Sequence, residues 1–220
     1  MNIRSMCGRS TLSAFSLVEL LIALCLAGTL SIPIALTVRE GRETRTMESA
    51  QDLVGAHLNA ARMHAIVSGK PCRLLVYSGR RENSELQWKL RSLIVAISNG
   101  DGTWSARDEP ICLPGNIRMV PRIAPPTLNP GGWGTAPLST ISGDTLQVIH
   151  LGDRHQSGYF YFVEFNSLGN TGGGTIVLSP GINRTVGDAG EVSFNHPNEI
   201  SGIRVSQYGA LTMLASASAF

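Results

Sequence analysis

The chain has 220 residues with 18 basic and 16 acidic side chains, so its formal net charge is only +2. This near-neutral balance gives no support for a basic nucleic-acid-binding surface, and we expect no nucleic-acid partner. Hydrophobic residues make up 43% of the chain, enough for a core, whereas 24 glycines and only 15% charged residues favour a loop-rich β domain over a helical bundle. This length predicts one globular domain beyond any membrane segment.

The first 38 residues divide into a short basic leader and a long apolar segment. The leader, residues 1–14, carries Arg4 and Arg9 as its cations. Residues 15–38 contain one charged side chain, Glu19, and a helix of this length would span roughly 36 Å, enough to cross a bilayer with tilt. Because basic residues tend to stay in the cytoplasm, the sequence predicts a single membrane pass with the rest of the chain on the opposite side.

Glu19 is the unusual residue of this segment. A charged group in hydrocarbon costs about 2.5–3.5 kcal/mol, so the carboxylate needs a proton or a cationic partner. Cleavage between Ala14 and Phe15 would create an α-amino group four residues before Glu19. That amine could pair with the carboxylate of the same chain or of a neighbour, and pairing with a neighbour would set the register of a helical assembly.

The residues from Ala14 to Leu21 resemble the processing site of type IV prepilins and type II secretion pseudopilins. The resemblance implies that a prepilin peptidase cuts before Phe15 and N-methylates it, and that Glu19 guides assembly with other pilin or pseudopilin subunits. It further implies a single-pass protein of the bacterial inner membrane, in contact with its lipid, with a head in the periplasm or on an extracellular filament. Ala14 departs from the family, which usually has Gly before the cut, and slower processing is therefore expected.

Three simpler interpretations of this segment fit its residues less well. An ordinary secretory signal has an apolar core of about 7–15 residues without acids, and this segment is longer and contains Glu19. A lipoprotein signal would need a small residue before Cys25, where Leu24 stands. A plain membrane anchor explains the length, but it explains neither Phe15 nor Glu19.

An amphipathic helix is predicted to follow over residues 39–69. Its apolar residues recur at steps of three and four, which indicates one buried stripe; they are Met47, Ala50, Val54, Leu58, Ala61 and Ala65. The other faces carry charged and polar residues, including Gln51, and Gly69 with Pro71 is predicted to end the helix. Pro33 should kink or loosen the preceding apolar segment, and His57 and His64 are expected to be surface or boundary residues.

From residue 70 onward the pattern changes to short strands separated by Gly, Asn, Asp and Pro. The predicted strands are 72–78, 86–98, 111–120, 145–151, 158–165, 174–178, 191–194 and a hairpin over 200–214. The predicted fold class is therefore α+β: a long N-terminal helix, made of membrane span and amphipathic stalk, packed on an antiparallel β-rich head over residues 70–220.

A long loop is predicted over residues 121–143, where five prolines and a Gly-rich stretch around Trp133 remove all periodicity. Trp133 is a candidate contact residue, or alternatively a side chain that folds back on the sheet.

The turn from Asn99 to Gly102 has some acidic character, but it lacks the ligand count and the closing Glu of a calcium loop, so no metal or other cofactor is expected.

The four cysteines fall in three different segments, and only two of them are candidates for a disulfide. Cys7 lies in the leader and Cys25 in the apolar segment, where it is most simply a small apolar residue. Cys72 and Cys112 fall in the predicted head, where they either form a disulfide or remain two buried thiols on separate strands. Their spacing matches no zinc site.

The head shows a second resemblance, to H-type (GspH/FimT-like) minor pseudopilins. It rests on the shared order of several short motifs, namely Trp88 in a strand, Asn99-Gly100-Asp101-Gly102, Leu113-Pro114-Gly115, Phe165-Asn166-Ser167-Leu168-Gly169, Gly174-Thr175-Ile176-Val177-Leu178 and the terminal hairpin over 203–211. With the processing site, the resemblance spans most of the chain except residues 121–143. It implies a minor subunit of a filament.

No catalytic set is found in the sequence: there is no Gly-x-Ser-x-Gly elbow, and Gly172-Gly173-Gly174 lacks the Lys and the helix of a phosphate loop. The first hypothesis is therefore a structural, non-enzymatic minor pilin or pseudopilin. A tip subunit that acts as an adhesin or captures DNA is the alternative, although Arg80-Arg81 is the only adjacent basic pair. A membrane-anchored enzyme is the third hypothesis, but the sequence offers no candidate catalytic residues for it.

Overall fold

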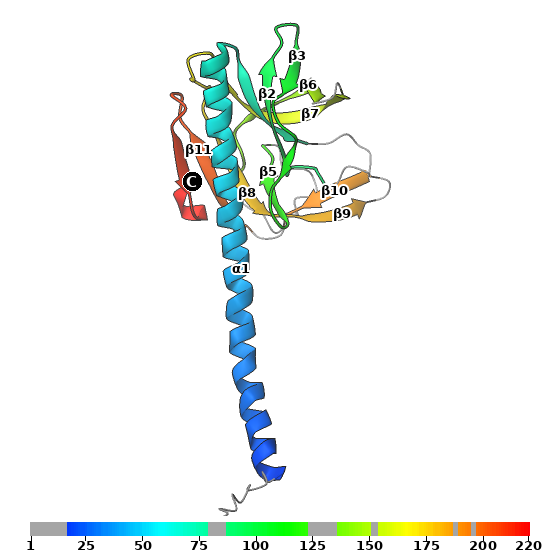
Figure 1. The fold of residues 1–220 in the computed structure, drawn as a ribbon, viewed down its shortest axis with the longest axis vertical. Helices are drawn as coiled ribbons and strands as arrows, with labels where there is room; N and C mark the ends of the chain where they lie inside the picture. Colours follow the sequence, from blue (N-terminus) through cyan, green and yellow to red (C-terminus); the bar gives the residue numbers. More distant parts are fainter. Residues whose placement is uncertain (1–16, 79–86, 123–135, 151–153, 187–188, 195–196) are drawn as a thin grey trace, which may run out of the picture. The chain divides into compact units, whose positions relative to one another are not determined.

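The computed structural model describes residues 17–78, 87–122, 136–150, 154–186, 189–194 and 197–220; for residues 19, 23–44, 154–155, 184–186 and 189–191 it describes the backbone alone. The described chain begins with one long helix, α1 (Leu17–Ser68), and continues through twelve strands to a short 3-10 helix, η2 (Ala217–Ala219) (Figure 1). The α+β class is therefore confirmed, with the helix first and the strands after it.

Helix α1 runs without interruption through both predicted helical segments, and its backbone remains helical at Pro33. It ends where the sequence predicts, because Gly69 takes a positive φ of 65°, the left-handed conformation that commonly follows a helix. The chain divides into two compact units, Met1–Glu43 and Thr44–Phe220, so the second unit contains the last part of α1 and all the strands.

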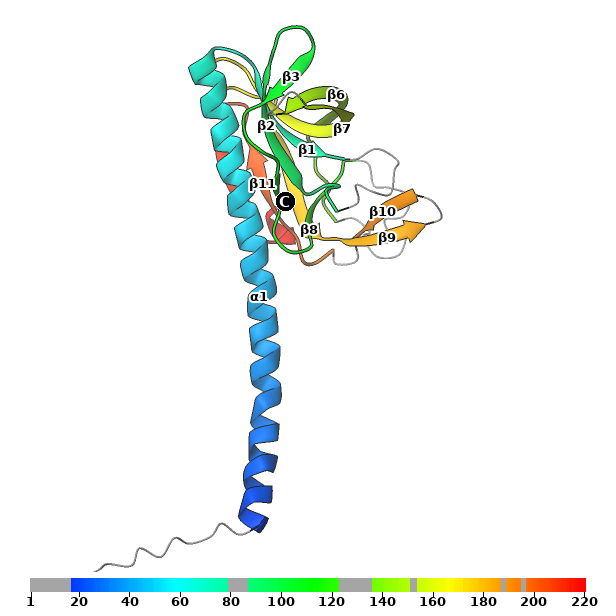
Figure 2. The ribbon, with the colours of Figure 1, turned by 45° about the vertical axis from the view of Figure 1, so that its right-hand side comes forward.

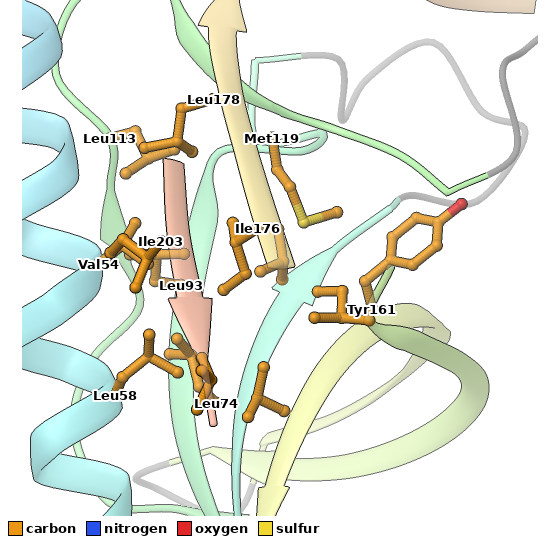
Figure 3. Close-up of a cluster of buried hydrophobic side chains, with 14 of the residues drawn as sticks. Val54, Leu58, Leu74, Leu93, Leu113, Met119, Tyr161, Ile176, Leu178 and Ile203 are labelled. Atoms are coloured by element: carbon orange, nitrogen blue, oxygen red, sulfur yellow. The ribbon is translucent and has the colours of Figure 1, made fainter. Parts of the chain in front are cut away.

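The apolar stripe of α1 forms part of the main core, as predicted. Ala50, Val54, Leu58, Ala61 and Ala65 are all buried in a cluster with side chains from the strands, and Met47 packs at its margin. Figure 3 shows Val54 and Leu58 directed toward Ile203 and Leu93. The helix is therefore held to the head by burial of one continuous face.

The first sheet has six strands in the order β1-β7-β6-β3-β2-β4, and β1 also pairs with β2. Its strands are β1 (Cys72–Tyr77), β2 (Ser92–Ser98), β3 (Thr103–Ala106), β4 (Ile111–Cys112), β6 (Ser142–His150) and β7 (Arg154–Phe165). The additional β1–β2 pairing closes five of them into a ring, in which β3 and β6 are parallel and every other pair is antiparallel. The sheet is therefore a small closed barrel with β4 added to β2, an arrangement that the sequence did not predict.

Closure of the barrel explains why β1 and β2 are buried on both faces. Alternate side chains point to opposite sides of a strand, so Leu74 and Val76 join the main core while Leu75 and Tyr77 point into the barrel. The barrel encloses a second, smaller core made of Leu75, Tyr77, Ile94, Ala96, Trp104, Ala106, Leu146, Val148 and Phe160. The ring of β-strands thus separates two hydrophobic clusters.

The second sheet is fully antiparallel, in the order β12-β11-β8-β5. Its strands are β5 (Ile117–Val120), β8 (Gly174–Pro180), β11 (Ser201–Val205) and β12 (Leu211–Leu214). Within the second unit α1 runs along this sheet beside β11, as both views show (Figures 1 and 2). A Cβ added to Gly55 would lie 2.7 Å from the end of the Met213 side chain, which shows how closely the helix approaches β12.

The hairpin over 200–214 is confirmed by β11 and β12, but three other predictions need correction. The strand predicted over 86–98 starts only at Ser92, because Trp88 and its neighbours form a turn in which the Trp88 carbonyl accepts bonds from Arg91 N and Ser92 N. Trp88 is therefore in a turn and partly exposed, and the strand placement that supported the second resemblance is wrong there.

The strand predicted over 111–120 is two strands in different sheets, β4 and β5. They are separated at Gly115, whose φ of 56° turns the chain. Two strands were missed entirely: β3, and β9 (Ile182–Val186), which forms a hairpin with β10 (Ala189–Ser193). Both are short, and neither has the apolar run that would predict a strand.

The loop predicted over 121–143 ends earlier than expected, because β6 already begins at Ser142. Just before it, Ser139 Oγ accepts a bond from Val177 N at 2.9 Å, and Thr140 exchanges bonds with both backbone groups of Thr175. These residues therefore bond to backbone groups on the edge of β8 beyond the end of β5. Trp133 lies outside the described residues.

Candidate functional site

The predicted processing site, Ala14 and Phe15, lies outside the described residues. Glu19 lies near the start of α1, where its backbone is helical, and its side chain is also outside the described part. Cleavage, methylation and the assembly role of Glu19 therefore stay predictions.

The start of α1 exposes large apolar side chains around Glu19. Leu17, Val18, Leu20, Leu21 and Ile22 keep between 52% and 77% of their surface accessible. Contiguous apolar surface of this kind marks a site that contacts lipid or another protein. We call these five residues the helix-start group.

No helical stretch among the residues open to description is both long enough and apolar enough to cross a membrane. The structure describes no side chains for most of residues 15–38, so the membrane span over these residues stays a prediction.

The possible disulfide between Cys72 and Cys112 is not formed, and both residues are free thiols. Strand β2 explains why: Cys72 pairs with Ile97 near one end of it, and Cys112 pairs with Ser92 at the other. Five residues of a strand correspond to roughly 17 Å, well beyond the Cα separation of about 7 Å that a disulfide tolerates. The alternative prediction of two buried thiols on separate strands is correct for the strands and for Cys72, whereas Cys112 is only half-buried.

Neither thiol is an activated nucleophile. Burial raises the pKa of Cys72 from 9.0 to about 12, although Arg107 opposes the effect. Burial also raises the pKa of Cys112, against the influence of Arg91 and Arg118. Reactive cysteines have lowered pKa values, so these environments do not favour thiol chemistry at neutral pH.

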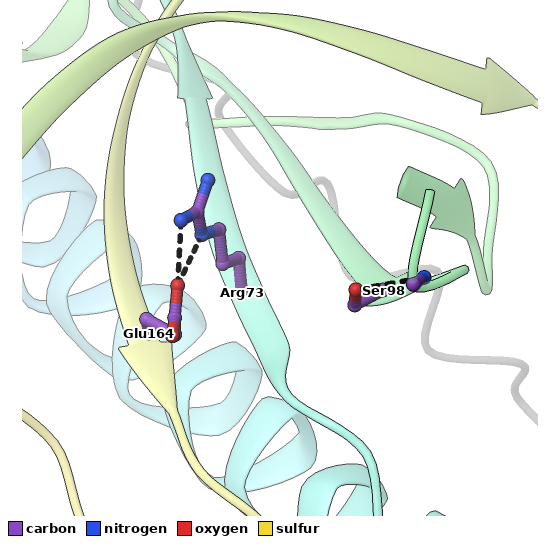
Figure 4. Close-up of polar contacts among 4 residues, drawn as sticks. Arg73, Ser98 and Glu164 are labelled. Atoms are coloured by element: carbon purple, nitrogen blue, oxygen red, sulfur yellow. Dashed lines mark hydrogen bonds and ion pairs between the residues drawn. The ribbon is translucent and has the colours of Figure 1, made fainter. Parts of the chain in front are cut away.

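Arg73 forms the most elaborate polar contact of the barrel. Its guanidinium lies 4.0 Å from the centre of the Trp104 ring and 3.9 Å from that of Phe162. Its Nε donates a hydrogen bond of 2.6 Å to Glu164, the residue opposite it on β7 (Figure 4). Because the cation is already stacked and paired, it is poorly placed to bind an anionic ligand.

A second arginine, Arg118 on β5, is almost completely buried. Its Nη2 donates to Asn183 Oδ1 at 2.7 Å, and its Nη1 donates to the carbonyl of Lys89. Burial, together with a smaller effect of the neighbouring Arg91, lowers its pKa from 12.5 to about 10, so the side chain remains a cation at neutral pH. These bonds join the turn before β2 to the β9–β10 hairpin.

The turn from Asn99 to Gly102 is built by its own hydrogen bonds. Asp101 Oδ1 accepts from Thr103 N at 2.9 Å and from Thr103 Oγ1 at 2.6 Å, and these bonds lower the pKa of Asp101. Ser98 Oγ accepts from Gly100 N, as Figure 4 also shows. Within the described parts of the chain, no three His, Cys, Asp or Glu side chains come together as a metal site would require.

Gln51 and Arg62 on α1 contribute bonds that the sequence pattern did not indicate. Gln51 was assigned to the polar faces, yet it is only 8% exposed, and its amide donates to the carbonyls of Gly202 at 2.6 Å and Leu214 at 3.3 Å. Arg62 Nε donates to the carbonyl of Gly169 at 3.1 Å. His57 and His64 are half-buried, as predicted, and His57 Nδ1 lies 2.8 Å from the Leu53 carbonyl.

No family model matches the sequence, and no curated protein matches it. Among solved structures, the chain is similar to the crystal structure of the type IV minor pilin FimU from Pseudomonas aeruginosa, with 11% identity, a TM-score of 0.38 and coverage of 76% of this chain and 87% of that chain. It is also similar to the minor pseudopilin EpsH from the type 2 secretion system of Vibrio cholerae, with 12% identity, a TM-score of 0.35 and coverage of 74% and 91%. TM-scores below 0.5 do not establish a common fold, so they leave the family of the chain open.

Proposed function

We propose that the chain is a structural minor subunit, without enzymatic activity, of a type II secretion or type IV pilus-like filament. Residues 15–38 would hold it in the bacterial inner membrane, with the head in the periplasm or on an extracellular filament. A prepilin peptidase would cut between Ala14 and Phe15 and N-methylate Phe15. Glu19 would then guide packing against other subunits.

The exposed helix-start group is the observation that carries this proposal. At roughly 25 cal/mol per Å² of apolar surface, leaving five large side chains in water is unfavourable, so the segment needs lipid before assembly and other helices after it. An acidic residue at position 19 within such a surface favours a defined polar partner over simple anchoring.

The other end of the same helix supports a structural role. From Ala50 to Ala65 its apolar face is buried in the main core, and Gln51 and Arg62 add bonds to the second sheet and to the turn after β7. A helix built into the head at one end and left apolar and exposed at the other suits a subunit that is carried by its helix into an assembly.

N-terminal analysis tests the processing. The full chain is produced together with a prepilin peptidase, and its intact mass and N-terminal peptide are measured. The expected product begins with N-methyl-Phe15, a catalytically inactive peptidase serves as control, and Ala14→Gly is expected to be cleaved faster. An unprocessed Met1 terminus beside the active peptidase would contradict the proposal.

A second experiment tests Glu19. Glu19→Ala should be cleaved normally but lost from filaments sheared from cells, because the register contact is missing. Glu40→Ala, which removes a carboxylate just beyond the apolar segment, is the matched control and should be incorporated normally. Native-level incorporation of the Glu19→Ala chain would remove the assembly role of this residue.

A further inference from the structure

The residues that follow β12 fold back over the second sheet, and we call residues 215–220 the strap. Residues 215–219 are alternating alanines and serines, all of them exposed, and they include the 3-10 helix η2. The ring of Phe220, in contrast, is partly buried and packs against the main core. Both views place the strap, drawn in red, beside β11 (Figures 1 and 2). The strap is therefore attached to the head mainly through Phe220.

The Phe220 ring lies on the face of the second sheet that points away from α1. Ile203 is directed toward α1 (Figure 3), so its neighbour Gly202 faces the other side of β11. Leu214 on β12 and Val177 on β8 lie directly opposite Gly202, and both are buried. A Cβ added to Gly202 would lie 2.7 Å from the ring, so the missing side chain is what leaves room for it. We call Gly202, Val177 and Leu214 the aromatic seat.

A hydrogen bond holds the backbone of the strap beside the aromatic seat. Arg204 lies two residues after Gly202 and therefore on the same face of β11, where it is exposed. Its Nη2 donates to the carbonyl of Phe220 at 3.2 Å. The outer face of the sheet thus combines a space for an aromatic ring with a donor for the carbonyl of the same residue.

The part of the strap between β12 and Phe220 is a hinge whose own bonds are internal. Ala219 N donates to the Ser216 carbonyl at 3.0 Å, and the hydroxyls of Ser216 and Ser218 lie 2.9 Å apart. Segments with few buried contacts open at a low free-energy cost. Extended, the five hinge residues span roughly 17 Å, which is long enough to carry the ring to a copy that touches this side of the head.

We propose that copies of this chain held close together exchange their straps, so that Phe220 of one copy occupies the aromatic seat of its neighbour. The ring and the carbonyl make the same contacts in either seat, and the exposed hinge has no buried contacts to lose. Exchange of an identical element between copies is for this reason a low-cost route to association.

Concentration then decides between closed and exchanged straps. A short flexible hinge presents the ring to its own seat at an effective concentration of about 1 mM, so a neighbour competes once copies are crowded to a similar degree. This inference rests on the proposed function, because packing in a filament supplies that crowding. The test below supplies it by protein concentration.

Photo-cross-linking of the full chain in mild detergent tests the exchange. The donor carries Phe220→p-benzoylphenylalanine, which keeps an aromatic ring and is photoreactive. The acceptor carries Phe220→Ala, which vacates its aromatic seat, and a different affinity tag. The native chain, whose seat is occupied, is the matched control acceptor. After illumination, the product carrying both tags is quantified, and mass spectrometry of its digest locates the attachment.

The expected result is several-fold more cross-linked heterodimer with the Phe220→Ala acceptor than with the native acceptor, attached to peptides from β8 or β11. The yield should rise as the protein concentration approaches about 1 mM. It should fall when the acceptor also carries Arg204→Ala, because the exposed donor to the strap carbonyl is lost. Equal yields for the two acceptors would overturn the proposal, and so would attachment confined to residues 17–22, which would indicate contact through the helix-start group.

A second measurement leaves the aromatic seat filled in every copy and so covers the case in which Phe220→Ala fails to fold. Two batches of the Phe220→p-benzoylphenylalanine chain, one of them labelled with heavy nitrogen, are mixed and illuminated. Cross-linked peptide pairs that combine both labels report exchange, and their share should rise with concentration. Pairs of one label alone at every concentration would overturn the proposal. Since no peptidase is present, failure here is distinguishable from an unprocessed Met1 terminus, which contradicts the proposed function itself.

Discussion

Arg73 and Glu164 face each other across β1 and β7, and the ion pair between them measures 2.6 Å while the Arg73 guanidinium lies between the rings of Trp104 and Phe162. The side chain of Arg73 is only 15% exposed, whereas that of Glu164 is 40% exposed. The cation therefore depends more on the two rings than on the carboxylate.

The relative cost of removing the two partners follows from this geometry. Arg73→Ala should lower the free energy of unfolding by about 2–3 kcal/mol, because it removes two cation–π contacts and the buried methylene stem. Glu164→Gln should cost about 0.5–1 kcal/mol, as expected for a partly exposed ion pair. Urea unfolding of the full chain in mild detergent, followed by tryptophan fluorescence, measures both; equal losses would mean that the ion pair dominates.

Gln51 provides a prediction about the attachment of α1 to the second sheet. Gln51→Ala should cost about 1–3 kcal/mol, because the buried amide bonds to the Gly202 and Leu214 carbonyls are lost. Asp52→Ala, at the exposed neighbouring position, is the control and should change stability by no more than about 0.5 kcal/mol. The same denaturant titration applies, and similar values for the two variants would show that Gln51 contributes no specific attachment.

The two thiols of the head should differ in reactivity. In a chain carrying Cys7→Ser and Cys25→Ala, N-ethylmaleimide at pH 8 should modify the half-buried Cys112 slowly and the buried Cys72 only after denaturation. Mass spectrometry of the digested protein assigns the sites. Rapid labelling of Cys72 in the folded chain would contradict its buried position in β1.

Cys72 also makes the stability of the fold depend on pH. The pKa of Cys72 is raised to about 12 in the folded chain, so the fold favours the neutral thiol. Its contribution is fully present below the ordinary pKa of 9.0 and is lost as the pH rises toward 12. Between about pH 8 and 11, the unfolding midpoint should therefore fall more steeply with rising pH for the native chain than for Cys72→Ala. Parallel curves for the two chains would contradict a raised pKa of Cys72 in the folded state.

Two glycines near the end of α1 should respond oppositely to alanine. Gly209 has a φ of 75°, and an added Cβ would lie 2.6 Å from the Gly169 carbonyl, so Gly209→Ala should destabilise the chain by about 1–3 kcal/mol. An added Cβ at Gly172 meets no atom within 4 Å, so Gly172→Ala should be neutral or stabilising by up to about 1 kcal/mol. Thermal unfolding followed by circular dichroism compares them, and a neutral Gly209→Ala would mean that the turn can relax.

The helix and its buried stripe could be predicted from the sequence because their determinants are local. The spacing from Ala50 to Ala65 identifies the buried face, and Gly69 identifies the end, since both depend on residues within a few turns. The same reasoning assigned Gln51 to the surface, because amide side chains are usually exposed and its two acceptors lie more than 150 residues away.

The sequence by itself determined a long helix with an acidic residue in an apolar start, followed by a β-rich head. Only the tertiary structure decided that β1 and β2 close a barrel, that Cys72 and Cys112 pair with opposite ends of β2, and that the turns at Gly169 and Gly209 meet beside the end of α1. The physical reason is that these features depend on pairings between residues distant in the chain. Alternating apolar residues indicate that a strand has a buried face, but they do not indicate which strand lies beside it.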